Sequence, residues 1–180
     1  MPSLFDNTVA QPLADRLRPQ TIDDVAGQNH LLSPDAPLGR MLITGKVSSF
    51  ILWGPPGCGK TTIARLLAHH TNMAFEPISA VFSGVADLRK IFEEAGQRRQ
   101  TGRATILFVD EIHRFNRSQQ DGFLPYVEDG TVVLVGATME NPSFELNAAL
   151  LSRCKVFVLK RLDDDALESI VAPTRTTVPS

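Results

Sequence analysis

Cysteine is scarce in this sequence: the 180 residues include only two, Cys58 and Cys154. Two cysteines make neither a disulfide framework nor a zinc-ligand set, and they are typical of a protein in a reducing compartment. Long apolar runs are missing as well. No segment approaches the roughly 20 apolar residues that a transmembrane helix needs, and residues 1–16 lack the apolar core of a signal peptide. These absences predict a cytoplasmic protein with no membrane partner.

The sequence also lacks an excess of charge of either sign. Its 18 Lys and Arg residues against 20 Asp and Glu residues give a formal net charge of −2. This balance excludes a polycation that binds nucleic acid through bulk charge, so any contact with DNA must come from a local patch. One basic run is present, formed by Arg89, Lys90, Arg98, Arg99 and Arg103. It is either a solvated helix face or a DNA-facing surface, and no aromatic residues interleave with it for base stacking.

Apolar and amphipathic segments alternate along the chain, whose hydrophobic content of 43% is enough for a core. The apolar segments predict strands over residues 50–53, 74–79, 105–109, 131–135 and 156–159. The amphipathic segments predict helices over 38–46, 60–71, 85–100, 118–128, 143–152 and 163–171, with a cap at Ser83 and a disturbance at Pro125. Strands alternating with helices predict an α/β fold, a doubly wound parallel sheet with helices on both faces.

A complete phosphate-binding motif follows the first predicted strand. Its residues, which match G-x-x-x-x-G-K-[ST], are Gly54, Pro55, Pro56, Gly57, Cys58, Gly59, Lys60 and Thr61, with Thr62 next in the chain. The glycines let backbone N–H groups turn inward around phosphates, and the following helix adds its positive end. Lys60 is expected to reach the β- and γ-phosphates of ATP, and the Thr61 hydroxyl to hold Mg²⁺.

Cys58 lies within this motif. We expect its thiol to face out of the loop. A free cysteine there is either an inert space-filling residue, the usual behaviour, or a redox switch.

Two carboxylates, Asp110 and Glu111, end the third predicted strand. In a parallel sheet they emerge at the same edge as the phosphate loop. Asp110 is suited to order Mg²⁺ and its waters. Glu111 is suited to act as the general base that activates water against the γ-phosphate. The alternative is a helix-capping pair, but the complete phosphate loop favours the catalytic interpretation.

The phosphate loop and the acidic pair together resemble the AAA+ ATPases. More specific stretches resemble the family of the bacterial replication-associated recombination protein A, whose eukaryotic relative is the Werner-helicase-interacting protein. They cover residues 11–19, 113–121, 136–147 and 150–154. The likeness extends from about residue 11 to about residue 171. It implies a P-loop AAA+ fold with a five-stranded sheet.

The resemblance also implies a function in DNA repair and recombination at stalled replication forks. The implied partners are ATP and single-stranded or forked DNA, with single-stranded DNA-binding protein and replisome components beyond them, in a nucleoid-associated homo-oligomer. Arg18, Val25 and Gly27 lie where such relatives wrap the adenine. The alternative for that segment is a simple surface arm.

Arg153 matches the arginine finger of clamp-loader relatives, which completes the site of a neighbouring subunit. An arginine after a helix can also simply stabilise the helix C-terminus. Where the family has Ala-Thr-Thr, this chain has Ala137, Thr138 and Met139. A thioether cannot orient water as a hydroxyl does. Thr138 is expected to substitute, with slow hydrolysis as the concern.

The chain is short for the family, which continues into a helical lid and an oligomerisation region. We expect an extended arm over residues 1–20, a nucleotide-binding domain over 21–160 and the beginning of a truncated lid over 161–180. ATP binding should weaken without the lid. Two alternatives to an active ATPase stay open: a nucleotide-binding module with little or no turnover, and a related clamp-loader or Holliday-junction motor.

Overall fold

The computed structural model describes residues 28–160 of the chain. Within that range the chain forms one sheet from strands β1 (Phe50–Trp53), β2 (Ala74–Ser79), β3 (Thr105–Asp110), β4 (Val133–Thr138) and β5 (Lys155–Val158). All neighbouring strands run parallel, in the order β2-β3-β4-β1-β5. The predicted doubly wound sheet is confirmed. The predicted arm, the predicted adenine residues and the lid helix lie outside the described residues.

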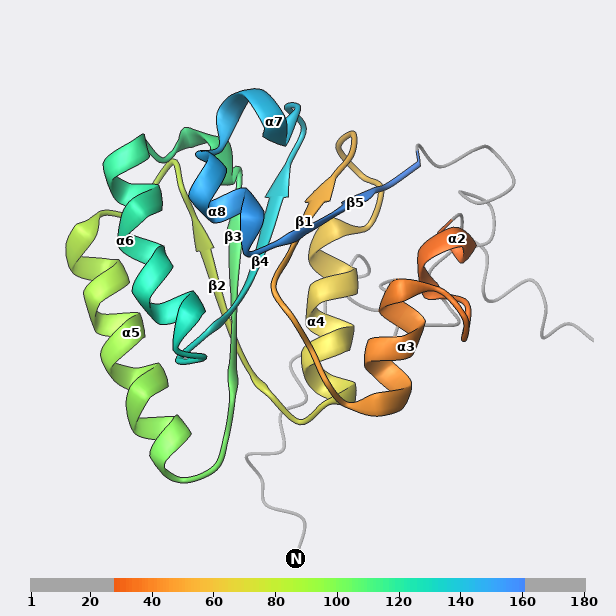
Figure 1. Ribbon diagram of the computed structural model, residues 1–180, viewed down its shortest axis with the longest axis horizontal. Helices are drawn as coiled ribbons and strands as arrows, with labels where there is room; N and C mark the ends of the chain where they lie inside the picture. The colour runs from red at the N-terminus through yellow and green to blue at the C-terminus, as the bar shows by residue number, and fades with distance from the viewer. Residues whose placement is uncertain (1–27, 161–180) are drawn as a thin grey trace, which may run out of the picture.

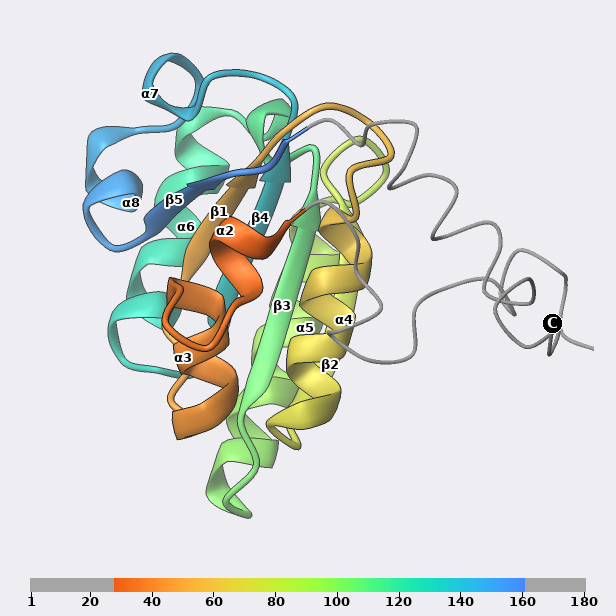
Figure 2. The same ribbon diagram turned by 90° about the vertical axis from the view of Figure 1, so that its right-hand side faces the viewer.

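Helices cover both faces of the sheet (Figures 1 and 2). They are α2 (Asn29–Leu32), α3 (Pro37–Thr44), α4 (Lys60–His70), α5 (Val85–Gln100), the 3₁₀ helix η2 (Ile112–Arg114), α6 (Arg117–Glu128), α7 (Pro142–Glu145) and α8 (Ala148–Ser152). One core cluster holds side chains of α2, α3 and α4, and the other holds side chains of α5, η2, α6 and α8. Among residues 28–160, no helix has the length and apolar character needed to cross a membrane.

The strands supply both core clusters by alternation. Phe50 and Leu52 pack with α4, whereas Ile51 between them packs with the helices of the opposite face, and all three are fully buried. Successive side chains of a strand point to opposite faces, so a continuous apolar run is what a strand covered on both faces requires. Each such side chain contributes roughly 1.5–3 kcal/mol on burial. This burial explains why β1 begins and ends where the sequence predicts.

Strand β4 extends three residues beyond its predicted end at Val135. Gly136 and Ala137 continue the strand. A Cβ atom at Gly136 would lie 2.8 Å from Ile51 Cδ1 and 2.9 Å from Ile112 Cδ1. Glycine at this position therefore lets the side chains of Ile51 and Ile112 pack closely over β4, and the strand reaches Thr138 at the functional edge of the sheet.

Three helix predictions are corrected, two of them by capping. The single helix predicted over 143–152 is two, because Leu146 is extended and the Asn147 side chain accepts a hydrogen bond from Leu150 N at 2.9 Å, which starts α8. Helix α6 continues through Pro125, where the sequence suggests a disturbance. Helix α5 begins after Gly84, not Ser83, and the Asp87 carboxylate accepts from Gly84 N at 2.9 Å.

Both outer edges of the sheet carry specific features. On β2, Ala74 N and Ala80 N donate toward β3, so Pro77, at the opposite parity, has its nitrogen on the outer side, where its missing N–H costs the sheet nothing. On β5, Val158 O lies 2.8 Å from His30 Nε2. Neither edge presents an uninterrupted row of free backbone groups.

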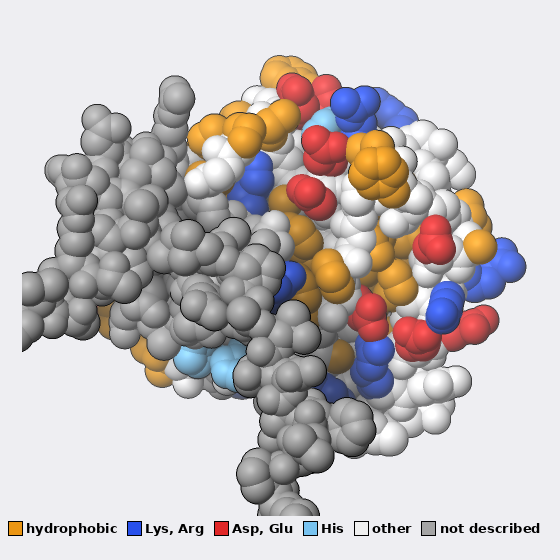
Figure 3. Space-filling model, turned by 180° about the vertical axis from the view of Figure 1, so that it is seen from behind, with side chains coloured by type: hydrophobic (Ala, Val, Ile, Leu, Met, Phe, Trp, Pro, Cys, Tyr) orange, Lys and Arg blue, Asp and Glu red, His pale blue; other side chains and the backbone are white. Residues whose placement is uncertain are grey.

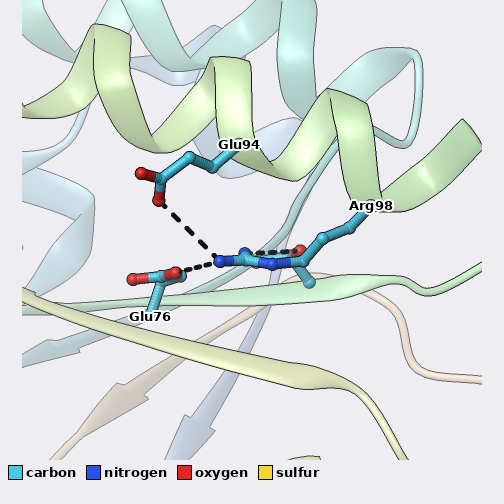
Figure 4. Close-up of polar contacts among 4 residues, drawn as sticks. Glu76, Glu94 and Arg98 are labelled. Atoms are coloured by element: carbon cyan, nitrogen blue, oxygen red, sulfur yellow. Dashed lines mark hydrogen bonds and ion pairs between the residues drawn. The ribbon is translucent and has the colours of Figure 1, made fainter.

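An ion-pair network joins β2 to α5 (Figure 4). Arg98 donates to Glu76 at 2.5 Å and to Thr105 Oγ1 at 3.3 Å, and it lies 3.8 Å from Glu94. The Arg98 and Glu76 side chains are only 28% and 24% exposed. This arginine of the basic run is therefore directed into the fold and not toward solvent.

Candidate nucleotide site at the carboxyl edge of the sheet

The phosphate loop is a left-handed turn between β1 and α4. Gly57 and Gly59 have φ of +75° and +96°, which side-chain-bearing residues rarely adopt. Gly54 is held differently: its N–H donates to Thr138 O at 3.1 Å, and a Cβ atom there would lie 2.8 Å from Leu159 Cβ. Close packing and backbone conformation together give this loop the shape of an anion-binding turn at a helix N-terminus.

Lys60 is the first residue of α4, and its ammonium group donates to Gly54 O at 2.6 Å. The side chain thus folds back over the loop it belongs to. Thr61 is exposed and Thr62 is half-buried. Pro55 is half-buried and Pro56 is exposed. The residues predicted to bind phosphate therefore lie together in the turn between β1 and α4.

The Cys58 thiol faces the core and not the outside of the loop, so that prediction is wrong. The residue is 1% exposed and belongs to the cluster packed on α4. Burial raises the pKa of the thiol above its ordinary value, although Lys60 opposes the shift. An inert space-filling role agrees with both observations, because reactive thiols need exposure and a lowered pKa.

Gln28, which ends the segment expected to wrap the adenine, has a role that the sequence did not predict: it ties the phosphate loop to the residues that follow β5. Its side chain is fully buried and donates to Cys58 O at 3.2 Å and to Lys160 O at 2.8 Å. Its carbonyl oxygen accepts from Lys160 N at 3.1 Å. The partners are 30 and 132 residues away, so no local sequence signal could have indicated this role.

The acidic pair lies at the same edge. Asp110 ends β3 and is exposed, while Glu111 is half-buried in a left-handed conformation, φ 52° and ψ 47°. A non-glycine residue with positive φ is uncommon and clusters at functional sites. The β3–β4 ladder ends at Val109 and Gly136, so both carboxylates come after the last paired residue of that ladder.

Strand β4 lies between the two motifs and ends in Thr138. Thr138 is 1% exposed, and its hydroxyl lies 2.9 Å from His113 Nδ1 and accepts from Glu140 N at 3.0 Å. The hydroxyl therefore contacts the segment after Glu111, while the Thr138 carbonyl holds Gly54. Met139, which follows, has a side chain 45% exposed.

Arg153 is placed away from this edge. It precedes β5, whose first residue Lys155 pairs with Phe50 at the amino end of β1, opposite the phosphate loop. Its guanidinium lies 3.0 Å from Glu128, with both side chains about half exposed. Arg153 and the chain's own phosphate loop thus lie at opposite ends of the central strands.

Charged side chains of both signs are interspersed on the face shown in Figure 3. In the predicted basic run, Arg98 contacts Glu76 and Arg99 lies 3.9 Å from Asp129. Arg89, Lys90 and Arg103 are exposed. Two of the five cations are therefore offset by carboxylates, which weakens the positive potential that a DNA-facing surface needs.

Known proteins are similar to this chain in sequence and in fold. Replication-associated recombination protein A of Escherichia coli (strain K12) is 54% identical over 167 residues, which cover 93% of this chain and 37% of that protein. The protein of the same name in Coxiella burnetii is 56% identical, and ATPase WRNIP1 of Dictyostelium discoideum is 47% identical over 19% of its length. The chain spans just over a third of the length of the bacterial relatives.

Among solved structures, the Thermotoga maritima RuvB Holliday junction branch migration motor matches with a TM-score of 0.64 and 27% identity, over 86% of this chain and 52% of that one. The family model of the ATPases associated with various cellular activities (AAA) matches residues 50–162, which contain both motifs of the carboxyl edge. This match covers more than half of the chain, and the chain therefore belongs to the AAA family of ATPases.

Proposed function

We propose that this chain binds Mg·ATP at the carboxyl edge of its sheet and hydrolyses it, as the nucleotide-driven part of a protein of DNA recombination and repair at stalled replication forks. The observation that carries the proposal is the separation of the phosphate loop and the acidic pair by one strand, β4. Adjacent strands lie about 4.8 Å apart. The two motifs follow β1 and β3, which are two such spacings apart, so both can act on one triphosphate.

Each residue has a role in this proposal. The backbone of residues 54–59 and the N-terminus of α4 bind the phosphates, and Lys60 turns from Gly54 O to the β- and γ-phosphates. Thr61 and Asp110 would hold Mg²⁺, which supplies neutralisation of phosphate charge. Their fit rests on chemistry: a hydroxyl and an exposed carboxylate are the oxygen ligands that this ion takes.

Glu111 would take a proton from the attacking water, which then displaces ADP from the γ-phosphorus in line. Its left-handed backbone ends the extended path of β3 directly after Asp110. Thr138 would support this group through the contacts of its hydroxyl. We place Arg18, Val25 and Gly27, which lie outside the described residues, at the adenine.

Arg153 would act in a neighbouring copy. Its position at the amino end of β5 is incompatible with reaching the phosphate loop of its own chain, so a catalytic role requires an oligomer. The ion pair with Glu128 is half exposed and can be exchanged for phosphate oxygens at low cost, since exposed pairs contribute only about 0–1 kcal/mol.

DNA as a partner rests on the names of the relatives, which refer to replication-associated recombination, and not on a surface of this chain. Single-stranded DNA-binding protein and replisome components are further partners that rest on the family resemblance alone. Nucleoid association would follow from DNA binding. Relatives named for replication-associated recombination are 41–56% identical, against 27% for the Holliday-junction motor, which favours the former.

A second candidate is a nucleotide-binding module with little turnover. The observation that favours it is Met139, whose exposed thioether stands where the resemblance predicts a hydroxyl. In this case the phosphate loop would still bind ATP, and only the step that depends on Glu111 would be slow.

The test measures Mg·ATP binding and phosphate release for the full chain and for Glu111→Gln. We expect Glu111→Gln to bind Mg·ATP with unchanged affinity and to lose turnover by at least about 100-fold, because the amide cannot accept the proton. EDTA should abolish turnover in the unmodified chain. Binding without turnover in the unmodified chain would support the second candidate. Turnover that survives in Glu111→Gln would contradict the proposed mechanism.

A further inference from the structure

His113 lies between the two halves of the site. It is the central residue of η2, which begins directly after Glu111. Its ring is half-buried, and its Nδ1 atom lies 2.9 Å from the hydroxyl of Thr138 at the end of β4. The mechanism proposed above assigns it no task.

The contact between His113 and Thr138 lies beyond the last paired residues of β3 and β4, next to the acidic pair. The β3–β4 ladder ends at Val109 and Gly136, so no strand pairing to β4 restrains Glu111. Beyond that point, the contact between His113 and Thr138 is a lateral polar connection from β3 to β4. Ile112 adds an apolar contact against Gly136. Apolar contacts are not directional, so this contact restrains the orientation of the Glu111 segment less than a hydrogen bond does.

The other hydrogen bonds of Thr138 bear on the direction of this contact. Its hydroxyl oxygen accepts from Glu140 N at 3.0 Å, and its proton has two acceptors within reach. These are His113 Nδ1 at 2.9 Å and Glu140 O at 3.3 Å. Nδ1 is the nearer of the two, and a ring that accepts at Nδ1 carries its proton on Nε2.

Thr138 is at the same time bound to the phosphate loop, because its carbonyl accepts from Gly54 N at 3.1 Å. One residue thus holds the first glycine of the loop through its backbone and the acidic turn through its side chain. Displacements of a reacting group by about 1 Å can cost on the order of 100-fold in rate.

We propose that His113 is a positioning residue that fixes Glu111 relative to the phosphate loop by accepting a hydrogen bond from Thr138. The proposal rests on the proposed ATP hydrolysis for its effect on rate, but the hydrogen bond itself can be tested without turnover.

The kinetic test compares three substitutions. Asn carries a polar atom at the branch position that Nδ1 occupies, Gln carries it one bond further out, and Ala carries none. We expect His113→Ala and His113→Gln to lower kcat by about 10- to 100-fold with KM for ATP changed less than twofold. His113→Asn should recover most of the loss. Arg117→Ala, at the exposed start of α6, is the control.

A double-substitution cycle locates the effect. Thr138→Val should lower kcat as His113→Ala does, and the two together should lose no more than either alone. Additive losses, recovery by Gln as good as by Asn, or a change in KM in place of kcat would overturn the proposal.

The second measurement is the ¹⁵N spectrum of the His113 ring in the full chain. We expect the Nε2–H tautomer with a hydrogen-bonded Nδ1, and a shift of the Nδ1 resonance in Thr138→Val. If that resonance is unchanged by Thr138→Val, the contact does not exist and the proposal is wrong. If the shift occurs while the unmodified chain releases no phosphate, the hydrogen bond stands and the proposed hydrolysis fails.

Discussion

At the carboxyl ends of β1 and β3 the backbone turns through left-handed conformations at Gly57, Gly59 and Glu111. Left-handed residues also precede the strands, at Asn72, Gly102 and Gly130, but there side chains cap and pair beside them. Ser49 Oγ accepts from Leu134 N at 2.9 Å, and the Asp129 carboxylate accepts from the N–H and the hydroxyl of Thr131 at 2.8 and 2.6 Å. One end of the strands carries the phosphate loop and the acidic pair, and the other end carries side-chain hydrogen bonds to the backbone.

The two ends of the sheet differ in what their residues do. Contacts at the amino ends contribute to folding stability, and residues at the carboxyl ends form the candidate nucleotide site. A left-handed backbone at a non-glycine residue such as Glu111 persists only when the surrounding structure holds it, and Ile112 beside it is fully buried in the core. The hydrogen bonds from Thr131 lower the pKa of Asp129, because they stabilise its charged form. Substitutions at the two ends should therefore separate activity from folding stability.

The largest expected effect belongs to Lys60→Ala at the carboxyl end. Its ammonium contacts only the Gly54 carbonyl among its hydrogen-bond partners in the described residues, so its loss should change the unfolding free energy by less than about 0.5 kcal/mol. Nucleotide affinity and turnover should each fall by at least about 100-fold. Titration with a fluorescent ATP analogue and denaturant unfolding measure the two effects.

Lys46→Ala is the matched control, since Lys46 is an exposed lysine outside the site. Equal losses of affinity in both variants would mean that general positive charge, and not the loop, binds the nucleotide.

A smaller effect, on folding stability and not on activity, is expected for Ser49→Ala at the amino end of the sheet. It leaves the buried N–H of Leu134 without its acceptor, which costs about 1–3 kcal/mol. Turnover per folded molecule should stay within twofold. Urea unfolding, with Ser48→Ala as the exposed control, gives the comparison. If turnover falls in step with stability, the two ends are not separable.

The smallest effect is on the reactivity of the two thiols, Cys58 near the carboxyl end of the sheet and Cys154 near the amino end. Burial raises the pKa of Cys154 to about 12 from an ordinary 9.0, and burial also raises that of Cys58, where Lys60 opposes it. A raised thiol pKa stabilises the folded chain below pH 9, and this contribution falls as the pH rises toward 12. In the folded protein both thiols should react with a disulfide reagent at least about tenfold more slowly at pH 9 than in urea.

Single-cysteine variants distinguish the thiols. Cys58 should be the faster of the two, and Mg·ATP should protect it alone. Rapid reaction of Cys58 near neutral pH would revive the redox-switch interpretation.

Much of the fold follows from the sequence because local signals determine it. The continuous apolar run of β1 marks its bounds, and the alternation of elements indicates the parallel sheet. The phosphate loop and the acidic pair are recognised from residue types at fixed spacing. Each of these predictions depends on residues close together in the chain.

What the sequence did not indicate depends on residues far apart. The end of β4 was misplaced, and the side chains that pack closely over Gly136 are those of Ile51 and Ile112. The buried amide of Gln28 acts on Lys160, 132 residues away, and His113 acts on Thr138 across 25 residues. Periodicity and motif spacing carry no information on such pairs, although they connect the parts of the site.

The proline on β2 has a consequence for assembly. An open edge strand is a template on which another chain can add a strand and start aggregation. With Pro77 in the outer row of donors on β2, and with His30 and Gln28 against the outward backbone groups of Val158 and of Lys160 just past β5, both described edges are interrupted as templates. Strand addition between two copies of this chain is therefore hindered at both edges of the sheet, which favours side-chain contacts over fused sheets wherever copies meet.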